Sequence, residues 1–374
     1  MKRVVKSIYA PTRYVFVADR FSNFISVTDI VSGEHVETLD FSMRPHVMEL
    51  ARDDAMLAVG SPEVSAIEFM NLRTRERRRV ELPSPVFQLF FVPQTNLVAV
   101  GLRDQVGMIS YKDFSVRIFP RRFDSDQRQT LINTYYSLLF SSFSQSFWVL
   151  DEDRPFIYHR YGGAEPLDAP WKTIDLSRHI GSGSGLGIGV ASPEDDLLAM
   201  TTDDGSEGLV YFPAQDKVLS TGPMRTVGST NEPMIMPYID AYSKHVIFAD
   251  VTGNVALFDL VNGNGKPERF RVNFSPRFVR TGWLESTWIL AGDKGIMFQS
   301  FKDPSDRKVV RFVPEVMNMW VTGDSKTALY TLDEGAPTIY RFDIRTREPL
   351  PPIRVRGVTM ASMLRMGSNN SICY

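Results

Sequence analysis

The segment from Tyr14 to Leu39, YVFVADRFSNFISVTDIVSGEHVETL, has the pattern of three consecutive β-strands joined by short polar turns. An apolar run, Val15 to Ala18, leads into a polar turn, and Ile25 and Val27 then alternate with hydroxyl side chains. This period of two is typical of a half-buried strand. Three antiparallel strands cannot bury both of their faces alone, so the unit must be repeated or packed on another layer.

The same rhythm recurs along the chain at intervals of about 40 to 50 residues, the period of a four-stranded propeller blade. After Tyr14, further apolar strands of this kind begin at Met56, Leu97, Ser146, Leu197, His245, Thr287 and Thr327. Innermost strands are expected just upstream, at Pro45 to Leu50, Val86 to Val92, Gly185 to Ala191, Pro233 to Ile239, Arg277 to Trp283 and Val316 to Val321. The sequence therefore predicts one all-β domain over residues 1–374, a closed β-propeller with eight blades of four antiparallel strands and helix only in short turns.

Two features of the ring remain open at this level. The segment from Gln127 to Ser144 is the least regular, so a degenerate fourth blade would reduce the count to seven. The ring must also be fastened, because an open array would expose strand edges. Either Val358 to Leu364 or the N-terminal Val4 to Tyr9 is expected to supply the strand that joins the last blade to the first.

Composition fits a globular domain and excludes some partners. The 374 residues are 43% hydrophobic and 23% charged, with a formal net charge of −2, so no overall field favours nucleic acid or anionic lipid. No apolar run approaches the roughly 18 residues that cross a bilayer. The first residues lack the apolar core of an export signal, and a single cysteine, Cys373, cannot form an internal disulfide. We therefore expect a cytoplasmic protein, or a periplasmic one if a signal was removed before this numbering.

Several residues match, in order, the consensus unit of a known repeat: Tyr14-Val15, Ser22-Asn23, Ile25 to Asp29, Gly33, Val36 to Leu39 and Pro45. In this respect the chain resembles the YVTN-type β-propeller repeat family. A second match is Gly187 to Met200, with Ser192 to Asp195 in the turn. The resemblance implies a propeller for most of the chain and implies no particular chemistry, because such folds carry unrelated functions.

No catalytic or metal-binding motif emerges from the sequence. The five histidines show no paired spacing, and only His46, at the head of an innermost strand, is a candidate for the central channel. The glycine-rich run Gly181 to Gly187 lacks the lysine of a phosphate loop, and the acidic pairs lack the spacing of a calcium loop. The basic run Arg73 to Arg79 is interpreted as protection of an outer strand edge. We expect neither a cofactor nor a metal, and the sequence favours a protein that is not an enzyme without settling the matter.

Two functional hypotheses follow. The first is a non-catalytic interaction or scaffold subunit that holds a protein partner through its loops and central funnel. The second rests on a more distant resemblance, to the heavy subunit of quinoprotein amine dehydrogenases, which implies a propeller bracing a small cofactor-bearing subunit. The five tryptophans do not recur at the docking position of quinone-cofactor propellers, so no such cofactor site is predicted in this chain.

For the interaction hypothesis, partner-binding residues should lie in loops that enter first strands and loops that join second to third strands. The candidates are Arg20, Phe21, Arg44, His46, Arg103, Asp104 and Arg154, with Asp153, Asp333 and Glu334 in equivalent loops. The buried layers between blades should instead contain Ile25, Val27, Val59, Val98, Met108, Val149, Leu198, Val255, Ile289 and Leu329.

Overall fold

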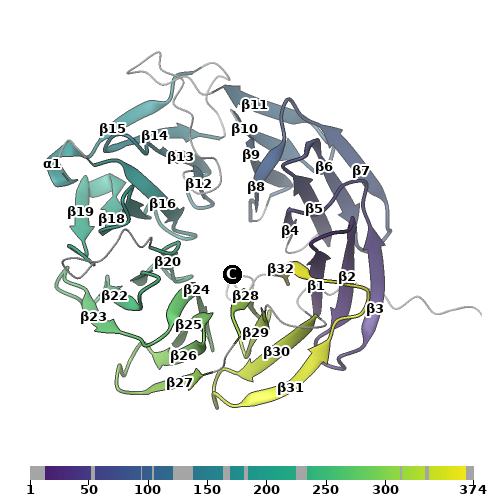
Figure 1. The fold of residues 1–374 in the computed structure, drawn as a ribbon. Helices are drawn as coiled ribbons and strands as arrows, with labels where there is room; N and C mark the ends of the chain where they lie inside the picture. Colours follow the sequence, from purple (N-terminus) through teal and green to yellow (C-terminus); the bar gives the residue numbers. More distant parts are fainter. Residues whose placement is uncertain are drawn as a thin grey trace, which may run out of the picture.

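The chain forms a ring of eight four-stranded sheets around a central channel (Figure 1). The computed structural model describes residues 13–51, 55–93, 95–102, 105–120, 138–162, 169–180, 184–224, 234–311, 314–332 and 337–367. All strand pairs within the sheets are antiparallel, as in a meander that runs from the channel to the outer rim. The predicted eight-bladed β-propeller is thus confirmed.

Each blade is numbered here by its order in the ring, with its innermost strand given first. Blade 1 contains β32 (Ala361–Arg365), β1 (Tyr14–Asp19), β2 (Phe24–Asp29) and β3 (His35–Asp40). Blade 2 contains β4 (Val47–Leu50), β5 (Met56–Ser61), β6 (Val64–Asn71) and β7 (Arg77–Glu81). Blade 3 contains β8 (Val86–Phe91), β9 (Leu97–Leu102), β10 (Gln105–Ser110) and β11 (Val116–Pro120). Blade 4 contains β12 (Leu138–Ser141), β13 (Ser146–Leu150), β14 (Phe156–Tyr161) and β15 (Lys172–Asp175).

The remaining blades follow the same order. Blade 5 contains β16 (Leu186–Ala191), β17 (Leu198–Thr202), β18 (Gly208–Phe212) and β19 (Lys217–Ser220). Blade 6 contains β20 (Tyr238–Ile239), β21 (His245–Ala249), β22 (Asn254–Asp259) and β23 (Glu268–Arg271). Blade 7 contains β24 (Ser275–Gly282), β25 (Thr287–Asp293), β26 (Gly295–Ser300) and β27 (Arg307–Arg311). Blade 8 contains β28 (Val316–Val321), β29 (Thr327–Leu332), β30 (Thr338–Asp343) and β31 (Pro349–Arg354).

Helix is confined to two short connections in the described part of the chain. These are α1 (Ser177–Ile180) and the 3₁₀ turn η1 (Pro213–Gln215), as the sequence predicted. No helix of the described residues is long and apolar enough to cross a membrane. Blade 4 is complete, and its innermost strand β12 lies within the irregular segment Gln127 to Ser144, so the alternative count of seven is wrong.

The ring is closed by the C-terminal strand. β32 pairs with β1, with Leu364 opposite Val17, and Figure 1 shows the yellow strand beside the purple one. The buried Asp19 accepts hydrogen bonds from the backbone N–H groups of Thr359 (2.7 Å) and Met360 (3.0 Å) just before β32. Of the two segments predicted to close the ring, Val358 to Leu364 contributes the strand, and Val4 to Tyr9 lies outside the described residues.

The hydrophobic core lies in the layers between neighbouring blades. All ten side chains predicted for these layers are buried, with at most 3% of their surface exposed. The second and third strands of each blade supply most of this core, because both of their faces are covered by adjacent blades. Outer strands are largely exposed, as the pattern of β7 shows.

Outer strands of neighbouring blades are linked by ion pairs. Arg75 contacts Glu37 of blade 1 at 2.7 Å, and Arg347 contacts Asp306 of blade 7 at 2.5 and 2.6 Å. Arg78 of the basic run lies over the ring of Phe114 in blade 3. The run Arg73 to Arg79 therefore leads into and begins the outer strand β7, which agrees with its interpretation as an edge feature.

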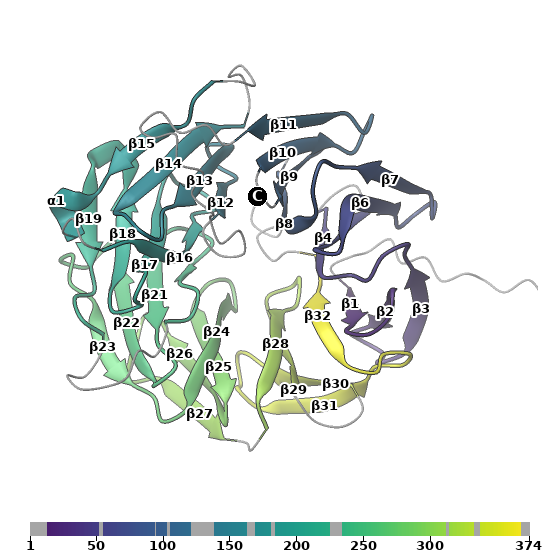
Figure 2. The ribbon, with the colours of Figure 1, turned by 45° about the horizontal axis from the view of Figure 1, so that its top comes forward.

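The antiparallel order divides the loops between two faces of the disc, which the tilted view helps to separate (Figure 2). We call "loop face" the side that carries the loops preceding innermost strands and those joining second to third strands. We call "hairpin face" the side that carries the loops joining first to second and third to fourth strands. Each innermost strand runs from the loop face to the hairpin face along the channel.

Candidate functional site in the central channel

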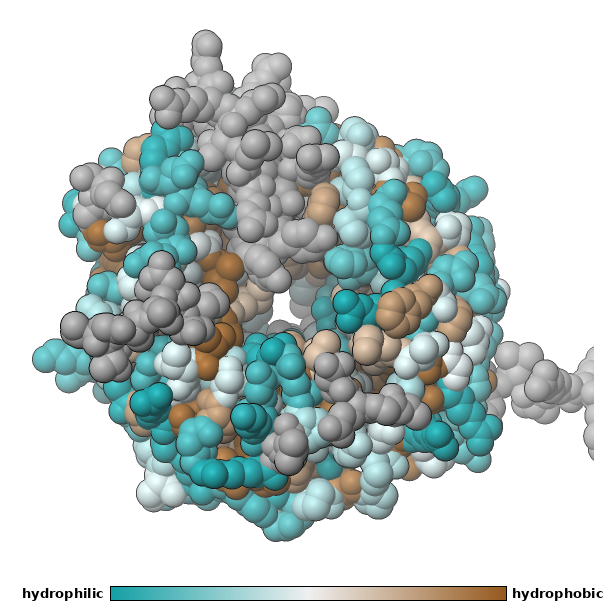
Figure 3. All heavy atoms as spheres, viewed as in Figure 1, coloured by the Kyte–Doolittle hydropathy of each residue, from teal (hydrophilic) through white to brown (hydrophobic). Residues whose placement is uncertain are grey.

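One position on each innermost strand forms a ring around the channel. It is fixed by register, since each such residue pairs with the equivalent residue of the second strand, as Glu49 does with Ala58 and Arg280 with Ile289. The eight residues, in blade order from blade 1, are Arg365, Glu49, Phe90, Leu139, Val190, Tyr238, Arg280 and Trp320. Figure 3 shows the opening at the centre of the disc that these strands surround.

Five consecutive members of this ring, Tyr238, Arg280, Trp320, Arg365 and Glu49, carry a charged or hydrogen-bonding group, and they form a continuous series that we call the polar arc. Arg365 Nε lies 3.2 Å from Glu49 Oε1, which joins blade 1 to blade 2. The Arg365 guanidinium lies 4.6 Å from the centroid of a Trp320 ring, and the Arg280 guanidinium lies 5.3 Å from it. Tyr238 completes the arc next to Arg280, whose charge acts on the Tyr238 hydroxyl. Two guanidinium groups therefore share one indole on the channel wall.

The other three positions form an apolar arc on blades 3 to 5. Phe90 and Val190 are half-buried, and Leu139 is buried in the layer between blades 4 and 5. Phe90 also stacks with Phe140 of the next blade, with ring centroids 6.0 Å apart. The channel wall is thus divided into a charged side and an apolar side.

The charged groups of the polar arc are incompletely solvated. Burial lowers the pKa of Arg280, and burial raises the pKa of Glu49 although Arg365 acts in the opposite direction. Arg280 donates one hydrogen bond, from Nη1 to the carbonyl oxygen of Val279 at 2.7 Å. Among the described residues it forms no ion pair, so most of its five N–H donors are available to a ligand.

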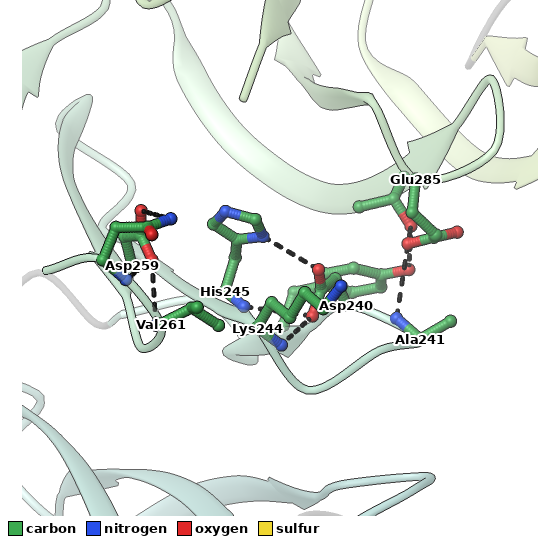
Figure 4. Close-up of polar contacts among 10 residues, drawn as sticks. Asp240, Ala241, Lys244, His245, Asp259, Val261 and Glu285 are labelled. Atoms are coloured by element: carbon green, nitrogen blue, oxygen red, sulfur yellow. Dashed lines mark hydrogen bonds and ion pairs between the residues drawn. The ribbon is translucent and has the colours of Figure 1, made fainter. Parts of the chain in front are cut away.

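A second polar cluster lies beside the arc, near the hairpin face (Figure 4). Tyr238 Oη lies 2.8 Å from Thr281 Oγ1, and Thr281 donates a hydrogen bond to Glu285. Across from Glu285, the carboxylate of Asp240 lies 2.9 Å from His245 Nδ1. Asp240 also accepts hydrogen bonds from the backbone N–H groups of Lys244 and His245, so this carboxylate holds its own turn.

The arrangement indicates binding of an anion more directly than it indicates a metal or a nucleophile. No group of three His, Cys, Asp or Glu side chains that could hold a metal ion occurs in the described ranges. Two arginines face one carboxylate in the arc, which leaves an excess of positive charge there. Arginine guanidiniums bind carboxylates in bidentate geometry and stack on planar groups.

The loop-face residues nominated from the sequence have different surroundings. Phe21 is 64% exposed, and the Arg20 guanidinium lies 6.0 Å from its ring centroid. Arg20 also contacts Met360 Sδ at 3.5 Å, next to the closing strand. Arg20 and Phe21 therefore form an accessible pair on the loop between β1 and β2, which belongs to the loop face.

Arg44 and His46 lie in the loop that enters β4. Arg44 pairs with Glu63 of the loop between β5 and β6, and His46 is exposed on the loop face. Burial, together with the charge of Arg44, lowers the pKa of His46. His46 precedes β4 by one residue and Glu49 by three, so it is not a member of the ring described above.

Arg154 stabilises its own turn. It donates to the buried carboxylate of Asp151 at 3.0 Å and to the hydroxyl of Tyr158 at 2.7 Å, and it lies over Phe156. The backbone N–H of Asp153 also donates to Asp151. The other nominated residues, Arg103, Asp104, Asp333 and Glu334, lie outside the described residues.

An open cleft of about 680 Å³ lies on the loop face between blades 6 and 7. Its lining includes Thr252, Arg271, Asn273, Asp293 and Lys294. Arg271 donates a hydrogen bond to the carbonyl oxygen of Thr252, which connects two loops across this cleft. Val251, Val272 and Phe274 also line this cleft, so its surface is mixed, and its position on the loop face separates it from the ring of channel residues.

The glycine-rich run contributes to packing where it is described. A side chain at Gly185 would lie 1.7 Å from the carbonyl oxygen of Glu152, so this position requires glycine for close approach of blade 5 to the β13–β14 turn. Gly181, Ser182 and Gly183 lie outside the described residues.

Sequence reasoning did not find the polar arc. The local signal is weak, namely a residue that directly follows a buried position of an innermost strand, as Glu49 follows Met48 and Arg280 follows Val279. Five widely separated residues become neighbours because their innermost strands surround one channel, and no local spacing identifies them as a set.

Comparison with known proteins gives the fold and no family. No family model and no curated protein sequence matches the chain. Among solved structures, the chain is similar to the dihydro-heme d1 dehydrogenase NirN in complex with DHE, with a TM-score of 0.72 and 14% identity. That match covers 98% of this chain and 77% of NirN.

Two further structures share the architecture. The computationally designed protein Ika8 gives a TM-score of 0.59 at 12% identity, covering 87% of this chain and 91% of Ika8. A functionally unknown protein from Desulfotomaculum acetoxidans DSM 771 gives 0.55 at 9% identity, covering 95% of this chain and 98% of that one. The class of protein is therefore an eight-bladed β-propeller.

Proposed function

We propose that this propeller binds a planar, polyanionic small molecule in its central channel. The observation that supports the proposal is the placement of Arg280 and Arg365 on either side of Trp320. Two cations and an aromatic surface on one wall are the groups that a flat molecule with carboxylates on one edge requires.

The free energy of such binding would come from Arg280 in particular. Arg365 already forms an ion pair with Glu49. Arg280, in contrast, has unused N–H donors and is incompletely hydrated. A carboxylate that reaches Arg280 would replace lost hydration with a charge-assisted hydrogen bond, worth about 1.5–3 kcal/mol. Arg365 is placed to bind a second carboxylate of the same molecule.

The apolar arc indicates the rest of the ligand. Phe90 and Val190 lie on the side of the channel away from the arginines, where a hydrophobic body would be favoured over water. A carboxylated tetrapyrrole has both features, a flat apolar macrocycle and anionic side chains. The similarity to NirN, which by its name acts on a dihydro-heme, supports this ligand class without assigning that reaction here.

The ring does not supply the usual side chains for binding a heme iron. His, Cys and Met are absent from its eight positions, and the Tyr238 hydroxyl is hydrogen-bonded to Thr281. The proposal therefore concerns the carboxylates and the planar body of the ligand, and no step is assigned to iron.

The test is a fluorescence titration with coproporphyrin, an iron-free tetracarboxylate, beside its tetramethyl ester as the matched control. We expect saturable binding of the acid and binding of the ester weaker by about tenfold or more, because the ester removes the charges that the arginines would bind. Equal binding of both compounds, or no binding of the acid, would contradict the proposal.

A second candidate function is capture of a protein partner by the loop face, which the accessible pair Arg20 and Phe21 favours. An exposed aromatic beside an arginine is the composition of an interface anchor. Changing Phe21→Ser together with Arg20→Glu should abolish capture of a co-purifying protein while the melting temperature stays unchanged. The matched control is Val261→Ser, an exposed residue of the hairpin face. Capture that survives the double change would exclude these two residues as the anchor.

A further inference from the structure

Tyr238, Thr281 and Glu285 form a hydrogen-bonded chain that begins at the channel ring and ends at the hairpin face. The Tyr238 and Thr281 hydroxyls are 2.8 Å apart, and either oxygen can donate to the other. Thr281 is buried, with 2% of its surface exposed, and its hydroxyl contacts Glu285. The backbone N–H of Ala241 in blade 6 also donates to Glu285, at 3.3 Å.

The protonation of Glu285 decides which group donates in each of these hydrogen bonds. An ionised carboxylate only accepts, so the Thr281 proton points to Glu285 and the Thr281 oxygen accepts the proton of Tyr238. A protonated Glu285 can donate to Thr281, which then donates to Tyr238. In that state the Tyr238 O–H no longer has a partner in the chain and is free to donate elsewhere.

We infer that a proton on Glu285 converts Tyr238 into a hydrogen-bond donor for an anion in the channel, so that ligand binding is coupled to proton uptake. This inference rests on the proposed function of the channel. Tyr238 is the ring neighbour of Arg280, so the released hydroxyl would act on the same anionic group as that guanidinium.

Several charged and titratable groups face Glu285. Tyr238, Asp240 and His245 approach from blade 6, of which Asp240 disfavours and His245 favours the ionised carboxylate. Within blade 7, the Thr281 hydroxyl donates to Glu285, and the charge of Arg280 acts on Tyr238. From blade 8, the Ser325 hydroxyl accepts the N–H of Leu284, and Arg345 lies over Trp283 in the same turn.

The sign of the coupling follows from these contacts. Burial raises the pKa of Glu285 above its ordinary value, against the opposing hydrogen bond from Thr281. Affinity for an anion should therefore be highest below the pKa of Glu285 in the folded protein and should fall as pH rises through it. His245 belongs to the same cluster through its contact with Asp240, so its contribution must be separated.

The ligand test uses pyrenetetrasulfonate, whose sulfonates stay ionised across the range, at about pH 5 and about pH 8. We expect the Kd of the unmodified protein to be about 10- to 100-fold lower at the acidic pH, the range of one charge-assisted hydrogen bond. Thr281→Val should bind tightly at both pH values, because Tyr238 is then always free, and Tyr238→Phe should bind weakly at both. Glu285→Gln should show no pH dependence, whereas His245→Gln should retain it. A pH dependence that survives Glu285→Gln or disappears in His245→Gln would overturn the inference.

A measurement without ligand separates two outcomes: an error in the inferred hydrogen-bond switch of Tyr238, and an error in the proposed function of the channel. In protein with ¹³C-labelled tyrosine, the Cζ resonance of Tyr238, assigned from Tyr238→Phe, should shift with pH in the unmodified protein and stay constant in Glu285→Gln. A constant resonance in the unmodified protein would overturn the inference whether or not pyrenetetrasulfonate binds. A shifting resonance with no binding at either pH would support the proton-dependent hydrogen bonds of Tyr238, Thr281 and Glu285, and it would contradict the proposed function instead.

Discussion

Arg365 Nε lies 3.2 Å from Glu49 Oε1, although 316 positions separate the two residues in the chain. Arg365 belongs to the closing strand β32 and Glu49 to the innermost strand of blade 2. The contact that joins these blades at the channel therefore also positions one of the two guanidiniums proposed to bind a ligand. Closure of the ring therefore joins Glu49 and Arg365 to the Trp320 side of the polar arc.

Glu49→Gln should alter the pH dependence of stability. Burial raises the pKa of Glu49 despite the attraction of Arg365, so the ionised form is disfavoured in the folded state. Its contribution to stability is fully present below the unfolded pKa of about 4.3 and is lost as pH rises through the folded pKa. The amide of the substituted side chain keeps an acceptor for Arg365 and does not titrate. Urea unfolding should show the variant gaining stability relative to the parent as pH rises through this window. A difference that is constant with pH would contradict the assignment.

Asp19→Ala should loosen the closure of the ring. Burial opposes ionisation of Asp19, but hydrogen bonds from the backbone of Met360 and its neighbours prevail and lower its pKa. The carboxylate therefore stabilises the fold above an unfolded pKa of about 3.9, and that stability is lost as pH falls through the folded pKa. We expect a loss of about 1–3 kcal/mol near neutral pH, the penalty for unsatisfied N–H groups. Hydrogen exchange should accelerate in Ala361–Arg365.

The matched control for this variant is Asp303→Ala. Asp303 accepts hydrogen bonds from Ser305 in an exposed turn and does not join the chain ends. Its replacement should leave exchange in Ala361–Arg365 unchanged. Equal acceleration in both variants would show that Asp19 has no special role in closure.

Val59→Asp or Ile289→Asp should unfold the protein. Both side chains are completely buried between blades, and an unpaired charge there costs several kcal/mol, a large part of the stability of a typical domain. Val261→Asp, at a residue that is 63% exposed, is the control and should melt like the parent. Thermal unfolding followed by circular dichroism checks all three. A normal melt for either buried variant would mean that the strand register is wrong.

The fold is largely predictable from the sequence, because the same local order of apolar strands and polar turns repeats in each blade. The sequence predicts strands such as Val316–Val321 at their observed bounds, because apolar residues occupy most of their positions. Outer strands of the later blades, such as Glu268–Arg271, were not specified, because exposed charged residues carry little periodic signal. The sequence leaves the fourth blade open because its innermost strand, Leu138–Ser141, lies within the least regular segment of the chain, Gln127 to Ser144.

The polar arc was not predictable in the same way. Arg280 and Trp320 are 40 positions apart in the printed sequence, and nothing local shows that they share a channel wall. The sequence instead favours loop residues as binding candidates, because polar residues in turns are expected to be exposed. Of these, Arg154 is engaged with Asp151 and Tyr158, a role that only the folded turn reveals.

The central claim is that Arg280 binds an anionic group of a channel ligand, and the most direct measurement compares Arg280→Gln with Arg277→Gln. Both arginines lie on β24, but Arg277 is exposed near the loop face and pairs with Asp293 and Glu315. In a coproporphyrin titration we predict that Arg280→Gln raises the Kd by about 10- to 100-fold, as expected for loss of a charge-assisted contact. Arg277→Gln should change it by less than about twofold. Equal Kd values for the two variants, with both proteins folded, would contradict the account.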